Sequence, residues 1–152
     1  MIKNARQYRI TRSQAAKFRD ALSQLDASPP GDTPPRLRQA IRDAIESQFL
    51  ELEGQLAEYD ALQRGEVTAL EVDSLAAIPH ALIAARIAAG LTQKELASRL
   101  GLAEQQIQQY EATDYASASV ARVGEIAEAL GVRLTGRVSL QGPSLARERA
   151  KR

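Results

Sequence analysis

Apolar residues in the first 66 positions recur at steps of three and four, the spacing that places side chains on one face of an α-helix. The sequence TRSQ at residues 11–14 reads as a capping box, so we expect a first helix to begin near Thr11. The run SPPG at 28–31 ends it. The run TPP at 33–35 starts a second helix that reaches about Gln63, roughly 45 Å at about 1.5 Å per residue. Residues 1–66 therefore predict a helical hairpin.

The second helix carries a coiled-coil-like seam. Between Ile45 and Tyr59 its apolar residues follow steps of four, three, four and three. The shorter first helix cannot cover this seam alone, so we expect association with a second copy. The alternative is a hairpin that buries the whole seam within one chain. The residues predicted to mediate dimerisation are Ile45, Phe49, Leu52, Leu56 and Tyr59.

Beyond the hairpin we expect a linker at 67–78, a domain at 79–140 and a basic tail at 141–152. VTALEV at 67–72 and VRLTGRVSL at 132–140 alternate in a way compatible with a short β pair, although Gly136 weakens that prediction. The tail consists largely of Gly, Pro, Ser and charged residues, and we expect it to be frayed and flexible. The predicted fold class is mainly all-α.

The most informative pattern is LTQKELASRLGLAEQQIQQYE, residues 91–111. Two short amphipathic helices meet here at a turn that contains Gly101, the residue type best suited to the left-handed conformation after a helix. In the second helix Ile107 and Tyr110 fall on the inner face. Its outer face carries four glutamines and one glutamate. Such a composition is typical either of a face that contacts DNA bases or of a face that is only exposed to solvent.

The segment from about Pro79 to Leu134 resembles the Cro and lambda-repressor type of helix-turn-helix, the XRE family. The matching residues are Gly90, LTQ at 91–93 with Leu96 and Ala97, Leu100 to Glu111, and EIAEALGV at 125–132. The resemblance implies a five-helix repressor-type domain that binds double-stranded DNA. The chain is also similar to antitoxins of the HigA type, which repress their own operon with this unit and bind a toxin protein with another surface.

Carried over residue by residue, the resemblance implies that Gln105 and Gln109 read bases. It also implies that Gln93 contacts phosphate and braces the second helix. A glutamine side chain both donates and accepts, as recognition of adenine N6 and N7 requires. Ala103 departs from the family pattern, which usually has a Ser or Thr cap there. The predicted DNA-binding set is Gln93, Glu104, Gln105, Gln106, Gln108 and Gln109.

Glu104 stands where a polar reader is common, and two interpretations of it stay open. It accepts a hydrogen bond from cytosine N4, or it is a first-turn acid that stabilises the helix dipole without reading a base.

Two charged residues within the segment that resembles the family are interpreted as structural. Arg86 lies among apolar residues of the first helix of the domain, and Glu111 ends the second helix of the pair. The family's geometry would bring them together as a partly buried ion pair. Removal of one partner from such a pair leaves an uncompensated charge, so we expect a clamp between helices.

The net charge of +1 conceals an uneven distribution. Residues 1–19 hold six basic residues and no acidic one, the last eleven hold four basic and one acidic, and residues 67–141 hold six basic and eight acidic. Because the helix-turn-helix is itself net acidic, neutralisation of phosphates must come from a few placed groups, from helix N-termini or from the basic ends.

Other chemistries find little support. The chain has no cysteine and one histidine, His80, which is more typical of a surface residue than of a catalyst. Metal-ligand spacings and nucleotide-binding glycine motifs do not occur, so we expect no metal, no cofactor and no enzyme activity. No signal peptide or membrane span is visible, and cysteine-free composition favours a reducing compartment, the cytoplasm.

Three functions are compatible with these features. The preferred one is a sequence-specific DNA-binding transcriptional regulator, a repressor that acts as a homodimer. The second is an antitoxin that also binds a toxin protein. The third is a coiled-coil interaction scaffold that does not bind DNA.

Overall fold

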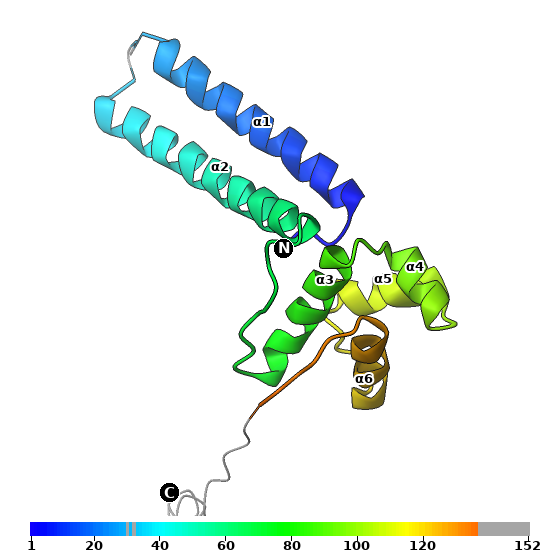
Figure 1. The fold of residues 1–152 in the computed structure, drawn as a ribbon. Coiled ribbons are helices and arrows are strands. Elements are labelled where there is room, and N and C mark those ends of the chain that lie inside the picture. The colour runs from blue at the N-terminus through cyan, green and yellow to red at the C-terminus, as the bar shows by residue number, and fades with distance from the viewer. Residues whose placement is uncertain (30, 32, 137–152) are drawn as a thin grey trace, which may run out of the picture.

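The computed structural model describes residues 1–29, 31 and 33–136, and this part of the chain contains helices and connecting segments only. A hairpin of two long helices projects from a group of four shorter ones, and the N-terminus lies at the base of the hairpin (Figure 1). The all-α prediction is confirmed, and the predicted tail at 141–152 lies outside the described residues. The helices are α1 (Ala5–Ala27), α2 (Pro35–Gln63), α3 (Ile78–Ala88), α4 (Gln93–Arg99), α5 (Glu104–Ala112) and α6 (Val120–Ala129), with a short 3₁₀ turn at Leu75–Ala77.

The first helix begins at Ala5, so the predicted start near Thr11 is wrong. The Asn4 side chain accepts a hydrogen bond from the Gln7 amide at 2.9 Å, and the Gln7 side chain accepts one from the Lys3 amide at 2.8 Å. These two bonds satisfy donors that a helix start otherwise leaves unpaired. Thr11 is buried in the hairpin instead of capping it.

The base of the hairpin is closed by α1. Leu56 and Tyr59 of α2 are each 7% exposed. Tyr8 of α1 packs on Tyr59 with ring centroids 5.0 Å apart, and its hydroxyl donates to Asp60 at 3.2 Å. Because α1 is longer than predicted, it covers this end of the seam. The expectation of an open seam is therefore wrong for Leu56 and Tyr59, whereas Phe49 and Leu52 are only partly buried against the same core.

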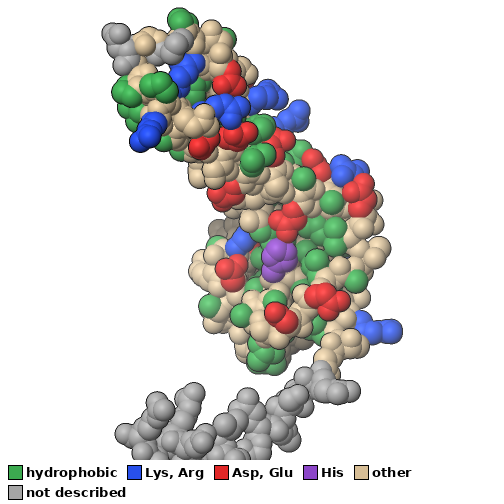
Figure 2. Space-filling view, turned by 90° about the vertical axis from the view of Figure 1, so that its left-hand side faces the viewer, with side chains coloured by type: hydrophobic (Ala, Val, Ile, Leu, Met, Phe, Trp, Pro, Cys, Tyr) green, Lys and Arg blue, Asp and Glu red, His purple; other side chains and the backbone are tan. Residues whose placement is uncertain are grey.

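Toward its tip the hairpin leaves apolar side chains open, since two helices cannot enclose their shared face on all sides. Leu37 is 53% exposed and Ile41 is 41% exposed. The Arg38 guanidinium closes the end of α1 by donating to the carbonyls of Leu25, Ser28 and Pro29. Figure 2 shows hydrophobic side chains at the surface near this end, beside lysines and arginines. We call the open and half-buried residues here the tip strip: Leu22, Leu25, Leu37, Ile41 and Ile45.

Helices α3–α6 surround the core of the second domain. From Leu75 onward the described part contains the 3₁₀ turn at Leu75–Ala77 followed by the four α-helices α3–α6. The fully buried apolar side chains include Leu82, Ile83, Ile87, Leu96, Ile107 and Ile126.

The expected β pair does not form in the described residues. Residues 67–72 and 132–136 have no strand structure, and residues 137–140 of the predicted pair lie outside the described part. Val67 and Val132 pack against the core, and the two segments line one groove with the alanines of α3. The two segments therefore pack beside α3 and do not pair with each other.

No single helix of the described residues is long and apolar enough to cross a membrane. The segments Leu75–Ala88 and Gln93–Arg99 pass such a test only as a pair bent by 98°. Their apolar side chains, Leu82, Ile83 and Leu96 among them, are buried in the domain core.

Candidate nucleic-acid interface

Helices α4 and α5 form a helix-turn-helix whose first member has a complete capping box. The Thr92 hydroxyl accepts from the Glu95 amide at 3.1 Å, and the Glu95 carboxylate accepts from the Thr92 amide at 2.7 Å. The Thr92 amide and the Thr92 hydroxyl both donate to the Glu95 carboxylate, and these two bonds hold the pKa of Glu95 below its usual value. Gly101 provides the turn with a φ of 66°, which places Leu96 and Ile107 in the shared core. The helix pair is therefore built by local signals that the sequence contains.

We expect Thr92→Ala to lower the free energy of unfolding by about 1 kcal/mol, because it leaves the amides at the start of α4 without their cap. Urea denaturation monitored by circular dichroism measures this loss. Thr68→Ala, in the irregular segment after α2, is the matched control and should leave the midpoint unchanged. An unchanged midpoint for Thr92→Ala as well would show that the cap does not contribute.

Glu111 joins three elements at the end of α5. Arg86 of α3 donates to its carboxylate from Nε at 2.5 Å and from Nη2 at 2.8 Å, and Gln93 of α4 donates to it at 2.8 Å. The Arg86 side chain is 3% exposed and that of Glu111 is 0% exposed. The two residues expected to form a clamp are thus in contact, and their pair fixes both helices of the helix-turn-helix to α3. Gln93 occupies the bracing position that the resemblance implied.

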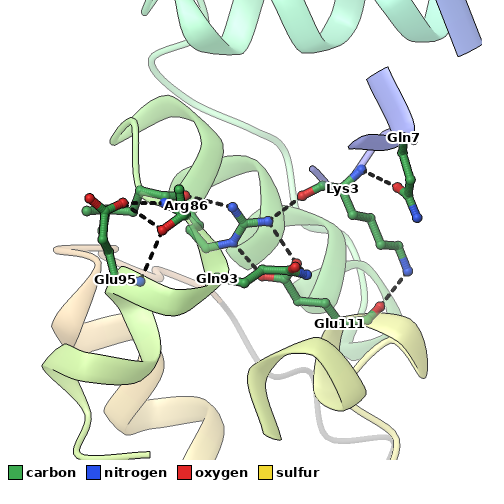
Figure 3. Close-up of polar contacts among 8 residues, drawn as sticks. Lys3, Gln7, Arg86, Gln93, Glu95 and Glu111 are labelled. Carbon is green, nitrogen blue, oxygen red and sulfur yellow. Dashed lines mark hydrogen bonds and ion pairs between the residues drawn. The ribbon is translucent and has the colours of Figure 1, made fainter. Parts of the chain in front are cut away.

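The remaining donors of Arg86 reach the backbone. Nη1 donates to the carbonyl of Leu91 at 2.7 Å, and Nη2 donates to the carbonyl of Lys3 at 2.6 Å. Figure 3 shows the guanidinium between Lys3 and Glu111. Each of the three guanidinium nitrogens is thus hydrogen-bonded, and such bonding is the condition under which a buried ion pair is tolerated.

Lys3 is a site residue that the sequence pattern did not indicate. Its ammonium donates to the carbonyl of Glu111 at 2.5 Å and pairs with Asp114 at 2.9 Å. The last carbonyls of a helix are unpaired and partly negative, so a lysine there is favourable. Together with buried Ile2, it fastens the start of α1 to the end of α5.

The glutamines on the outer face of α5 differ in whether their side chains are hydrogen-bonded. Gln106 accepts from the Ala103 amide at 3.3 Å, which is the half of a capping box that can form when the N-cap residue is an alanine. Gln108 donates to Glu104 at 3.0 Å, one turn earlier on the same helix. Gln105 and Gln109 are exposed and make no side-chain hydrogen bond within the described residues. The two residues implied as base readers are therefore the two whose amides are available.

Glu104 lies in the first turn of α5, where a negative charge favours the helix dipole. One of its carboxylate oxygens accepts from Gln108, and the side chain remains exposed. The arrangement is compatible with both interpretations of this residue.

The loop after α5 is locally strained. Asp114 and Tyr115 have φ values of 47° and 58°, a region that residues other than glycine seldom adopt. The Tyr115 ring is buried against Tyr110, with centroids 6.0 Å apart. Burial and the nearby Glu111 carboxylate raise the pKa of Tyr115, so its hydroxyl stays neutral.

His80 lies at the surface, where its Nε2 is 3.1 Å from a carboxylate oxygen of Glu58 (Figure 2). No group of three or more potential ligands that could hold a metal ion occurs in the described part of the chain.

Comparison with sequence families gives a match to helix-turn-helix (HTH_3) over residues 82–136. Comparisons with curated proteins and with solved structures gave no match. The matched segment spans α4 and α5 with the turn between them, most of α3, and α6. It is a family of DNA-binding regulatory domains and not of enzymes. Residues 82–136 therefore form a helix-turn-helix domain of the XRE type, and the chain is a DNA-binding transcription regulator.

Proposed function

We propose that the protein is a sequence-specific repressor that binds double-stranded DNA as a homodimer. The observation that supports sequence-specific binding is that the α5 glutamines differ in their hydrogen bonding. The amides of Gln106 and Gln108 are bonded within α5 or its cap, whereas those of Gln105 and Gln109 are open to a base edge. Both open residues lie one turn apart on a helix held by the Arg86–Glu111 pair. A rigid helix with open amides is suited to base readout in the major groove.

Dimerisation follows from the charge and size of the DNA-binding unit. Residues 67–141 hold eight acidic and six basic side chains, so one domain neutralises few phosphates. Two linked domains gain affinity because the second binds at a high effective concentration. The tip strip supplies an apolar surface on the projecting hairpin where a second copy can pack, forming a four-helix bundle.

We expect Ile41→Glu to convert the dimer to a monomer, because a charge in the tip strip would be buried by association. Leu50→Glu is the matched control. Leu50 is 60% exposed on the same helix but lies nine residues further on, which at about 3.6 residues per turn is the opposite face. Light scattering after size exclusion separates one chain of 16.5 kDa from two. A monomer with Leu50→Glu and a dimer with Ile41→Glu would place the interface on the other face.

Selection of duplexes from a random pool tests the proposed function as a whole. We expect two half-sites related by two-fold symmetry, with centres about 34–36 Å or a multiple apart. A single half-site would contradict the homodimer. Failure to enrich any duplex would contradict DNA binding by this chain and favour the scaffold. Co-purification of a second protein at fixed stoichiometry through the tip strip would favour the antitoxin alternative.

A further inference from the structure

We propose that the start of α1 is a second DNA-contacting element, in which Arg6 binds the phosphate backbone beside the bases read by α5. The inference rests on the proposed function, since it concerns the same complex. It assigns a role in DNA binding to the N-terminal hairpin, which lies outside the helix-turn-helix segment at 82–136.

The structural basis is an open groove of about 600 Å³ between the start of α1 and the helix-turn-helix. One wall carries Lys3, Arg6 and Gln7, and the other carries Gln93, Glu104 and Gln108. The groove is therefore continuous with the outer face of α5. In the docking mode of helix-turn-helix proteins the second helix lies in the major groove and the first helix crosses the sugar-phosphate backbone. The proposal places that backbone over this groove, beside the start of α1.

The charges in this groove single out Arg6. Its basic lining residues are Lys3, Arg6 and Arg86, and its acidic one is Glu104. Lys3 is paired with Asp114, and Arg86 is paired with Glu111. Arg6 is exposed and makes no ion pair or side-chain hydrogen bond within the described residues. A guanidinium held open beside a DNA-reading helix has the chemistry to bind a phosphate, and it supplies a positive charge that the net-acidic domain lacks.

The position of Arg6 relative to α5 is fixed. The carbonyl of Lys3 accepts from Arg86, and its ammonium donates to the last turn of α5, with Ile2 buried beside them. The Asn4 cap then begins α1 at Ala5. Because the chain from Ile2 to Arg6 is held at several points, the backbone at Arg6 loses little freedom on binding, which favours affinity.

The same contacts decide which variants can test the role of Arg6. Deleting residues 1–10 would remove Ile2 and Lys3 together with Arg6, so it would disturb the site as well as the charge. Arg6→Gln removes only the charge of an exposed side chain. Lys17→Gln is the control, because Lys17 is an exposed cation on the same helix about 16 Å further from the groove at about 1.5 Å per residue.

Binding of the full-length chain to the duplex selected with the wild type, and to a random duplex of equal length, is titrated with salt. We expect Arg6→Gln to reduce the slope of log affinity against log salt by about 0.9 on both duplexes, the value for one lost phosphate contact. Lys17→Gln should keep the wild-type slope. Hydroxyl-radical footprints should lose protection at backbone positions flanking the half-site only with Arg6→Gln.

Three outcomes overturn the proposal in distinguishable ways. Equal slopes and footprints for wild type and Arg6→Gln would show that α1 does not reach DNA, while wild-type binding would still support the proposed function. A loss confined to the selected duplex would make Arg6 a base reader. If the wild type bound no duplex, the proposed function would fail and this inference with it.

Discussion

Arg86→Ala is expected to lower the free energy of unfolding by about 3–5 kcal/mol, more than we expect from any of the other substitutions. The physical reason is the charge left behind. Without Arg86, the carboxylate of Glu111 stays fully buried with only Gln93 donating to it, and the carbonyls of Leu91 and Lys3 lose their partner. Urea denaturation of the full chain measures the loss. DNA binding should fall mainly through unfolding.

Arg122→Ala is the matched control for this experiment. Arg122 pairs with Glu125 at 2.5 Å on α6, but both side chains are partly exposed, so its loss should cost about 1 kcal/mol or less. Glu111→Gln gives an independent check, because it keeps the shape of the side chain and removes the charge that Arg86 needs. A fully stable Arg86→Ala protein with impaired binding would contradict the clamp and make Arg86 a DNA contact.

The helix-turn-helix could be predicted because its signals are local. Thr92 and Glu95 cap α4 across three residues, Gly101 provides the turn, and Ile107 sets the inner face of α5. Each of these contacts joins residues that are close in the sequence. The Arg86–Glu111 pair spans a longer separation, and it could be proposed only from the resemblance to a known family.

The attachment of the hairpin to the domain could not be predicted in this way. Lys3 and Glu111 are 108 positions apart, and nothing near either residue indicates the other. The start of α1 was mispredicted for a different reason. Asn4 and Gln7 have the spacing of a capping box, as do residues 11–14, and local spacing alone does not distinguish the two. With the earlier start, the longer α1 covers Leu56 and Tyr59, whereas the residues of the tip strip stay open or half-buried.

The predicted β pair shows the limit of alternation as a signal. The run from Val67 to Val72 alternates only in part, since Ala69 and Leu70 are adjacent, and its two valines line a surface beside the alanines of α3. A short alternating run gains as much from packing on a helix as from pairing with one neighbouring strand, because an isolated two-stranded pair is barely stable.

Gln109→Ala and Gln105→Ala are each expected to weaken binding to the preferred duplex by about 1–3 kcal/mol, the contribution of a bidentate contact to a base. The open amide of each glutamine would lose its donor and acceptor together, so discrimination at one base pair should relax. Competition binding against duplexes with all four pairs at each position measures this. Because neither side chain is bonded within the described residues, the stability of the protein should not change.

Gln106→Ala is the control from the same face of α5. Its carboxamide already accepts from the Ala103 amide, so it should alter no base preference and only slightly destabilise the start of the helix. Equal losses on preferred and random duplexes for Gln105 or Gln109 would assign that residue to phosphate. If Gln106→Ala relaxed specificity and the Gln105 and Gln109 variants did not, α5 would present a different face to the DNA. The division between bonded and open glutamines would then reflect helix capping alone.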